Sequence, residues 1–332
     1  MRMTVFGGGS WGTALAHLMA AKGLPVTLLL RDPEQARAVN ERHENPRYLP
    51  GLTLHPALAA STEADKALQD ADICLLAVPC QFLRAALGQV AAHLPAHTVP
   101  VCASKGIELA TLKRMSEVVA DVLPGHAQRY AILSGPSFAR EVVENKPTAV
   151  ALGCADAGLG RKLRELFSTP LFRVYSGTDL TGVEVGGAFK NVMAIAAGLC
   201  DGLNLGANAR AALITRSLAE MCRLGVAMGA REGTFMGLSG MGDLVLTCTG
   251  DLSRNRQVGL RLAAGEKLAG IAAGLGMVAE GVKTAEAVCL LGERLGIELP
   301  VAGAVRRVLV EGALPSDLVG LLMARDLKEE QQ

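Results

Sequence analysis

The sequence predicts an α/β protein whose first half is a doubly wound sheet and whose second half is all-α. Strand and helix patterns alternate along the first half, which is typical of a sheet covered by helices on both faces. The strand patterns stop near residue 180, and a chain of 332 residues is long for a single hydrophobic core. We therefore expect two domains, 1–180 and 181–332.

Short apolar runs predict the strands. Residues 3–6 (MTVF) begin the sheet, a helix over 13–23 follows, and 25–30 (PVTLLL) forms the second strand. Residues 72–79 and 98–106 are continuous apolar runs, which favours parallel strands that are buried on both faces. The remaining expected strands are 130–135, 148–153 and 171–177.

After residue 180 the periodic segments are helical, and glycine-rich turns separate them. The expected helices cover residues 184–199, 209–229, 256–265, 283–296 and 300–312. The second domain is therefore expected to be all-α.

Composition excludes several classes of protein. The formal net charge is +1, and no run of lysine and arginine is dense enough to bind nucleic acid or lipid headgroups. The longest apolar runs, such as 268–279, are shorter than the roughly 18 to 20 residues that span a bilayer. No signal peptide precedes the first strand, so we expect a cytoplasmic protein without membrane association.

The sequence predicts no metal site. The 8 cysteines are scattered and form no C-x-x-C pair. His93 and His97 have the spacing of a metal-binding pair on a helix, but Pro95 lies between them and disfavours one helical face.

A glycine-rich turn after the first strand predicts a dinucleotide site. Gly7, Gly9 and Gly12 have the G-x-G-x-x-G spacing, between a strand and a helix. Gly7 allows a tight turn, Gly9 allows a pyrophosphate to approach the backbone, and Gly12 allows close packing of helix on strand. Ser10 and Trp11 would contact the ligand mainly through their backbones, at the helix N-terminus.

The end of the second strand indicates which nucleotide is bound. A carboxylate there would select the ribose 2′-hydroxyl of NAD, whereas an arginine accommodates the 2′-phosphate of NADP. Arg31 takes this place and Asp32 follows it, so NADP(H) is favoured and NAD(H) stays open. In the alternative interpretation, Arg31 only solvates the edge of the sheet.

Polar residues at the ends of two later strands predict a ligand pocket, because ligands of doubly wound sheets bind beyond the carboxyl ends of the strands. Ser104 and Lys105 follow one strand, and Gly135 and Ser137 follow the next. Ser137 is also placed to cap a helix that begins near Phe138.

A second group of polar residues lies in the helical half. Asp243 sits among glycines and apolar residues, which is an unusual setting for a carboxylate. Ser253 is expected to cap a helix whose first turn carries Arg254 and Asn255. A cation at a helix N-terminus is repelled by the helix dipole, which is unfavourable. A bound anion, such as a substrate phosphate, would offset this repulsion. The alternative is an ordinary exposed arginine.

From Gly186 onward, Lys190 is the one full charge in a predicted helix that is otherwise apolar or small on every side. Burial of a lysine is unfavourable and lowers its pKa toward the range of a general acid or base. A lysine whose amine reaches solvent from a core helix is the alternative.

Together these segments resemble the bacterial type of NAD(P)-dependent glycerol-3-phosphate dehydrogenase. The match runs nearly end to end, in the order of the family. The matching segments are GGGSWGTALA, HENPRYLPG, LLAVPCQF, ASKGIE, SGPSFAREV, VGGAFKNVMAIAAG, GDLVLTCTGDLSRNR and VAEGVKTAEAV. The resemblance implies a Rossmann domain, a helical domain of the 6-phosphogluconate dehydrogenase-like kind, and a homodimer. It also implies interconversion of dihydroxyacetone phosphate and sn-glycerol 3-phosphate, which supplies phospholipid synthesis.

The resemblance also implies roles for individual residues. Lys190 would be the proton donor and acceptor, with Asp243 orienting it or Lys105. The residues implied around the substrate are Lys105, Gly135, Ser137, Lys190, Asp243, Ser253, Arg254 and Asn255, with Asn191 and Thr247 as further contacts. Those implied at the cofactor are Ser10, Trp11, Arg31, Lys105, Ala139, Arg254, Val278 and Glu280, with Tyr48 nearby.

Two other functions stay open on the residues alone. The first is a related reductase that acts on a hydroxy acid, because the anion site near Arg254 could hold a carboxylate. The second is an NADP(H)-sensing protein without catalysis, which would not need Lys190, Lys105 and Asp243 together.

Overall fold

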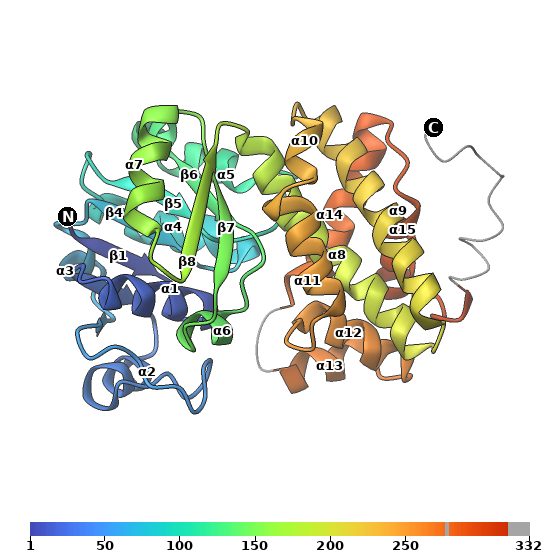
Figure 1. Cartoon of the computed structure of the whole chain (residues 1–332), viewed down its shortest axis with the longest axis horizontal. Coiled ribbons are helices and arrows are strands. Elements are labelled where there is room, and N and C mark those ends of the chain that lie inside the picture. The colour runs from blue at the N-terminus through green and yellow to red at the C-terminus, as the bar shows by residue number, and fades with distance from the viewer. Residues whose placement is uncertain (276–278, 318–332) are drawn as a thin grey trace.

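The computed structural model describes residues 1–275 and 279–317. Figure 1 shows a sheet flanked by helices beside a group of packed helices, with α8 (Leu180–Gly202) leading from the first part into the second. The N-terminal half is therefore α/β and the described part of the C-terminal half is helical, as the sequence predicts.

Eight strands form one sheet in the order β3-β2-β1-β4-β5-β6-β7-β8. Seven of them lie where the apolar runs predict strands. The short strand β3 was not predicted, because Ala-Ala-Ser has no β-branched or aromatic residue to mark it. The strands are β1 (Met3–Phe6), β2 (Val26–Leu29), β3 (Ala59–Ser61), β4 (Ile73–Leu76), β5 (Val99–Cys102), β6 (Ala131–Ser134), β7 (Thr148–Cys154) and β8 (Phe172–Gly177).

The direction of the last two strands departs from a wholly parallel sheet. Strands β1 to β6 pair in parallel, but β7 pairs antiparallel with β6, and β8 pairs parallel with β7. The sheet is therefore mixed. The carboxyl ends of β1, β2, β4, β5 and β6 all meet at one edge of the sheet, where a doubly wound fold binds its ligand.

Helices connect the strands of the sheet. Helix α1 begins at Ser10, three residues before the predicted helix, so its first turn directly follows the glycine loop. The others are short and partly buried against the sheet. The helices of this half are α1 (Ser10–Ala21), α2 (Pro33–Arg37), α3 (Ala64–Leu68), α4 (Cys80–Val90), α5 (Met115–Val122), α6 (Ala139–Val143) and α7 (Ala157–Phe167), with short turns η1 (Ala38–Arg42), η2 (Ala91–His93) and η3 (Pro124–Arg129).

The helical half contains the five predicted helices. Three described α-helices, α10, α11 and α13, lie outside the predicted ranges; the apolar, β-branched run of α11 does not show helical periodicity. The elements after α8 are α9 (Gly206–Ala227), α10 (Glu232–Phe235), η4 (Leu238–Gly242), α11 (Asp243–Thr249), α12 (Arg254–Ala263), α13 (Leu268–Leu275), α14 (Glu280–Leu295), α15 (Pro300–Arg306) and η5 (Arg307–Glu311).

Helix α8 is the centre of the helical core. It is long and apolar enough to cross a membrane, contrary to the expectation from run lengths, but 94% of its most apolar window is buried inside the protein. It packs on α12 through backbone atoms, because a Cβ added to Gly198 would lie 2.1 Å from the carbonyl oxygen of Arg256. A Cβ on Gly259 would likewise lie 2.2 Å from the carbonyl oxygen of Ile195. The glycines therefore allow these two helices to touch directly.

Candidate active site

The glycine loop has the geometry that the sequence predicts. Gly7 has φ +125, and a Cβ there would lie 2.6 Å from the carbonyl oxygen of Ala77. A Cβ on Gly12 would lie 2.0 Å from the carbonyl oxygen of Gly7, so α1 can approach β1 only without a side chain at this position. A Cβ on Gly9 would meet nothing within 4 Å. The backbone at Gly9, the N-cap of α1, is thus open to a ligand.

A buried polar network that was not predicted fixes this loop. Gln35 and Asn45 both donate to the carbonyl oxygen of Gly8, at 2.6 and 3.1 Å. Asn45 also donates to the hydroxyl of Thr13 in α1 and accepts from Gln35. Ser10 donates to the carbonyl oxygen of Tyr48, so the segment around Asn45 holds both ends of the loop. Asn45 and Tyr48 belong to the HENPRYLPG segment, which in the sequence indicates only the family resemblance.

The two residues after β2 have different surroundings. Asp32 caps α2, accepting from the backbone N–H groups of Glu34 and Gln35. The Arg31 side chain is exposed at the carboxyl-end edge of the sheet. Arg47 lies on the other side of Asp32, with its guanidinium 4.0 Å from the Asp32 carboxylate. Because the Asp32 carboxylate is hydrogen-bonded to the N-terminus of α2, Arg31 is the residue of the two whose side chain can contact the cofactor ribose.

Lys190 is buried and paired. Its Nζ donates to Asp243 Oδ1 and to Thr247 Oγ1, both at 2.8 Å. Asp243 and Thr247 occupy the first and second turns of α11, and the Thr247 hydroxyl also donates to the Asp243 carbonyl oxygen. Lys190 is 9% exposed and Asp243 is 1% exposed, so the amine does not reach into bulk solvent. The interpretation of Lys190 as a core lysine with a solvated amine is therefore wrong.

Lys105 reaches the same carboxylate from the sheet. Its Nζ donates to Asp243 Oδ2 at 2.6 Å and to the carbonyl oxygen of Gly135 at 3.1 Å. One carboxylate thus bridges two lysines, one from each half of the chain. Ser137 does not cap α6, because its hydroxyl donates to the Gly135 carbonyl oxygen and the N-cap is Phe138 without a side-chain bond.

The charges of this cluster are coupled. Burial lowers the pKa of Lys190 to about 8, the Asp243 carboxylate opposes this fall, and Lys105 contributes to it by like-charge repulsion. Burial acts to raise the pKa of Asp243, but the two ammonium groups hold it below its usual value. Asp243 is therefore ionised at neutral pH, while Lys190 can gain or lose a proton near pH 8.

The N-terminus of α12 is held in place by buried hydrogen bonds. Ser253 is its N-cap, as predicted, and accepts from the backbone N–H of Arg256. The Asn255 amide donates to Asn191 Oδ1 at 2.9 Å and accepts from the backbone N–H of Gly281 at 3.0 Å. Asn255 therefore joins α12 to α8 beside Lys190 and to the start of α14.

Arg254 and Glu280 lie at the boundary between the two halves. The Arg254 side chain is exposed, and Glu280 and Tyr48 interact electrostatically with its guanidinium. Glu280 Oε1 accepts from the backbone N–H of Cys80 at the start of α4. Burial raises the pKa of the Glu280 carboxyl to about 7, which the hydrogen bond from Cys80 partly opposes.

Among the buried polar atoms without a partner in the described residues are Glu280 Oε2, at this boundary, and Trp11 Nε1, in the first turn of α1. Such atoms are expected to pair with a ligand. With the open backbone at Gly9, they fit a dinucleotide that extends from the glycine loop toward α14. Ala139 begins α6, after the strand that ends beside Gly135, and Val278 lies outside the described residues.

The cluster can perform proton transfer next to a bound anion. It combines a lysine whose pKa is about 8, a carboxylate held by two hydrogen bonds and a second lysine amine. Arg254 lies at the N-terminus of α12, the helix that Asn255 joins to Asn191 next to Lys190. Over 1–275 and 279–317, no three His, Cys, Asp or Glu side chains are grouped so that they could hold a metal ion.

Two family models match this chain. The model for the N-terminus of NAD-dependent glycerol-3-phosphate dehydrogenase matches residues 2–159, and the model for its C-terminus matches 179–320. The chain belongs to the NAD-dependent glycerol-3-phosphate dehydrogenase family. The resemblance inferred from the sequence motifs is thereby confirmed.

Relatives in the glycerol-3-phosphate dehydrogenase family match over nearly their whole length. The glycerol-3-phosphate dehydrogenase (NAD(P)+) of Nitratidesulfovibrio vulgaris strain Hildenborough is 62% identical over 330 residues, which is 99% of this chain and 100% of the relative. The crystal structure of glycerol-3-phosphate dehydrogenase from Coxiella burnetii superposes with a TM-score of 0.93 at 38% identity and covers 98% of this chain and 99% of that one.

A reductase outside the glycerol-3-phosphate dehydrogenase family shares the fold alone. A ketopantoate reductase from Ralstonia eutropha aligns with a TM-score of 0.61 at 16% identity, over 96% of this chain and 100% of that one. The hydroxy acid alternative thus has a similar architecture but none of the sequence support that the family has.

Proposed function

We propose that this chain is an oxidoreductase that interconverts dihydroxyacetone phosphate and sn-glycerol 3-phosphate with NAD(P)H. The observation that carries the proposal is the Asp243 carboxylate that bridges Lys190 and Lys105, with Arg254 at the N-terminus of the helix that Asn255 joins to Asn191. This arrangement can supply a proton and hold an anion, which the reduction of a phosphorylated ketone requires in addition to a hydride donor. Family membership supports the same substrate pair.

Lys190 donates the proton in the direction of ketone reduction. The bound nicotinamide supplies a hydride to C2 of the substrate, and the oxygen on C2 then needs a proton. The Lys190 ammonium stabilises negative charge on that oxygen and transfers the proton to it. In the oxidation direction, neutral Lys190 accepts the proton from the C2 hydroxyl. Asp243 orients both lysine amines, and Lys105 holds Lys190 near its working pKa.

The phosphate of the substrate is held where α12 begins. Arg254 provides the charge, and the N-terminus of α12 provides a favourable dipole. Ser253 caps this helix terminus, and Asn255 bonds it to Asn191, the residue after Lys190. The other proposed substrate contacts are Gly135, Ser137, Asn191 and Thr247.

The cofactor lies on the edge of the sheet, with NADP(H) preferred and NAD(H) accepted. The glycine loop binds the pyrophosphate, and Arg31 binds the 2′-phosphate. Glu280 Oε2 and Trp11 Nε1, which are buried and have no partner among the described residues, would bond to the rest of the dinucleotide. The remaining proposed cofactor residues are Gly7, Gly9, Ser10, Gly12, Tyr48, Lys105, Ala139, Arg254 and Val278.

The setting of the enzyme follows from this assignment. We place the domain boundary near residue 180, where β8 gives way to α8. A homodimer in the cytoplasm that supplies glycerol 3-phosphate for phospholipid synthesis, without nucleic-acid or membrane partners, agrees with the near-neutral charge and the buried α8.

One assay tests the function directly. Oxidation of NADPH and of NADH is followed at 340 nm with dihydroxyacetone phosphate, unphosphorylated dihydroxyacetone and a 2-keto acid. We expect the phosphorylated ketone to be turned over far faster than the other two, because remote binding energy serves the reacting centre. Faster turnover of the keto acid would establish the hydroxy acid alternative, and no turnover with binding of NADPH would establish the sensor.

A further inference from the structure

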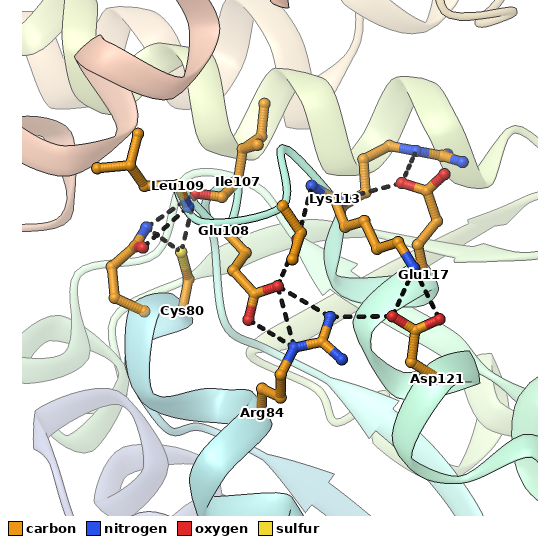
Figure 2. A network of polar contacts seen from close by, with 11 residues as sticks. Cys80, Arg84, Ile107, Glu108, Leu109, Lys113, Glu117 and Asp121 are labelled. Carbon is orange, nitrogen blue, oxygen red and sulfur yellow. Dashed lines mark hydrogen bonds and ion pairs between the residues drawn. The ribbon is translucent and has the colours of Figure 1, made fainter.

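The loop that follows Lys105 is anchored from behind by a polar cluster that the proposed mechanism does not use. Figure 2 shows Arg84 of α4 lying between the carboxylates of Glu108 and Asp121. Arg84 Nε and Nη2 donate to Glu108 at 2.9 to 3.1 Å, and Nη2 also donates to Asp121 at 3.0 Å. Lys113 extends the cluster with two hydrogen bonds to Asp121.

Glu108 is buried, and its contacts are specific. Its side chain is 7% exposed, and Thr111 donates to the same carboxylate as Arg84 does. Burial acts to raise the pKa of Glu108, but the bonds from Arg84 and Thr111 outweigh it and lower the pKa. A buried carboxylate held by a two-pronged guanidinium has one well-defined geometry. The Arg84–Glu108 pair therefore fixes Glu108 relative to α4 more firmly than a solvated ion pair would.

The same loop is also pinned through its backbone. Gln81 of α4 donates to the carbonyl oxygen of Ile107 at 2.8 Å and accepts from the N–H of Leu109 at 3.0 Å. Gly106 has φ +152, and a Cβ there would lie 2.5 Å from Cys80 Sγ, so the chain lies tightly on the start of α4. The residues directly after Lys105 are thus fixed to α4 at three successive positions, 107, 108 and 109.

We propose that the Arg84–Glu108 pair positions Lys105 for the reaction, by holding the loop 106–113 so that the Lys105 amine stays against Asp243. Lys105 is the one group on the sheet side that reaches the Asp243 carboxylate among the contacts of the described residues. Asp243 also accepts a hydrogen bond from Lys190. A displacement of Lys105 would therefore move its positive charge away from Asp243 and from Lys190, the proposed proton donor. Arg84 and Glu108 touch no reacting atom, so they act through Lys105; the inference rests on the role of Lys105 in the proposed function.

A double-mutant cycle tests this coupling, with kcat and KM measured for dihydroxyacetone phosphate and NADPH. Glu108→Gln and Arg84→Gln should each lower kcat by about 10- to 100-fold, because small misplacements of catalytic groups have effects of this size. Arg84→Lys should recover only part of the loss, since lysine cannot make the two-pronged contact. In a Lys105→Met background, Glu108→Gln should change kcat less than twofold. An undiminished effect in that background would show that Glu108 acts independently of Lys105 and overturn the proposal.

A matched control separates positioning from stability. Glu220 of α9 is also a buried carboxylate, and it accepts from the backbone N–H groups of Val301 and Ala302. Glu220→Gln should lower the melting temperature and leave kcat within twofold of the wild type. If Glu108→Gln does not fold, Arg84→Lys alters the same pair while keeping a cation beside Glu108, and the same cycle applies. Wild-type kcat in a folded Glu108→Gln or Arg84→Lys enzyme would overturn the positioning role alone. A wild-type enzyme without activity on dihydroxyacetone phosphate would instead overturn the proposed function.

Discussion

Lys190 Nζ lies 2.8 Å from Asp243 Oδ1, and both side chains are buried although they are 53 positions apart in the chain. The contact joins the central helix α8 to α11. It orients an amine whose charge would otherwise be strongly disfavoured in this core. The following predictions start from this pair and move outward.

Lys190→Ala should lower the rate of hydride transfer by at least about 10²- to 10⁴-fold, because the proton donor is lost. Binding of NADPH should be nearly unchanged, since the glycine loop lies on the sheet. Single-turnover absorbance at 340 nm and fluorescence titration of the cofactor measure the two effects. The melting temperature serves as the control for folding. A folded variant that transfers hydride at the wild-type rate would remove Lys190 from the mechanism.

The pH dependence should differ in sign between the two directions of the reaction. Ketone reduction needs protonated Lys190, so its kcat should fall as the pH rises through about 8. Alcohol oxidation needs the neutral amine, so its kcat should rise over the same range. Asp243 raises the pKa of Lys190, and Asp243→Asn should therefore move both transitions to lower pH. Steady-state profiles measure this, and a move to higher pH would contradict the assigned coupling.

Arg31→Ala should weaken NADPH selectively. The loss of a charge-assisted contact with the 2′-phosphate corresponds to roughly 1.5 to 3 kcal/mol, or about a 10- to 150-fold rise in KM for NADPH. The KM for NADH should change little. Arg37→Ala is the matched control, because Arg37 is another exposed arginine, in the helix that follows Asp32, and it pairs with Glu34. Equal effects of Arg31→Ala on both cofactors would show that Arg31 does not contact the 2′-phosphate.

Arg254→Ala should lower kcat/KM for dihydroxyacetone phosphate by a similar factor, about 10- to 150-fold. Activity on unphosphorylated dihydroxyacetone should stay the same, because that substrate has no phosphate to lose contact with. Comparing the two ketones within one variant removes any general effect on folding. Parallel losses on both ketones would assign Arg254 to another role.

Two glycines of the loop should separate folding from binding. Gly9→Ala places its methyl group in open space, so the melting temperature should stay the same while NADPH affinity falls. Gly12→Ala forces a methyl against the Gly7 carbonyl and should destabilise the fold by about 1 to 3 kcal/mol. Gly88→Ala in α4 also meets open space, away from the loop, and is the control. Unfolding in urea measures the stability of each variant, and cofactor titration measures its affinity for NADPH. NADPH binding by Gly9→Ala as tight as that of the wild type would show that the pyrophosphate does not lie against Gly9.

The local features of the fold could be predicted from the sequence, because they depend on neighbouring residues. The strand β1, the glycine loop and the Ser253 cap are such features. The direction of β7 could not be predicted: residues 135–147 are long enough for a parallel or an antiparallel return. Helix α11 could not be predicted either, because its continuous apolar run Leu-Val-Leu is equally compatible with a buried strand.

The candidate site was predicted as a set of residues but not as a geometry. Lys105 and Asp243 are 138 positions apart, and nothing local to either indicates that they share a hydrogen bond. The Gln35 and Asn45 contacts with the Gly8 carbonyl were missed for the same reason. Their signal in a single sequence is only that of polar residues in a loop or on a helix.

The direct contact between α8 and α12 limits which molecules can react. Lys190 lies on α8 and Arg254 begins α12, and glycines at 198 and 259 leave no side chain between the two backbones that could yield. The spacing of these two helices is therefore set by main-chain atoms. If Lys190 donates the proton and Arg254 binds the phosphate as proposed, a ketone phosphate with one more carbon between its carbonyl and its phosphate should be a poorer substrate. Separating the helices to admit it would break the backbone contact at Gly198 and Gly259.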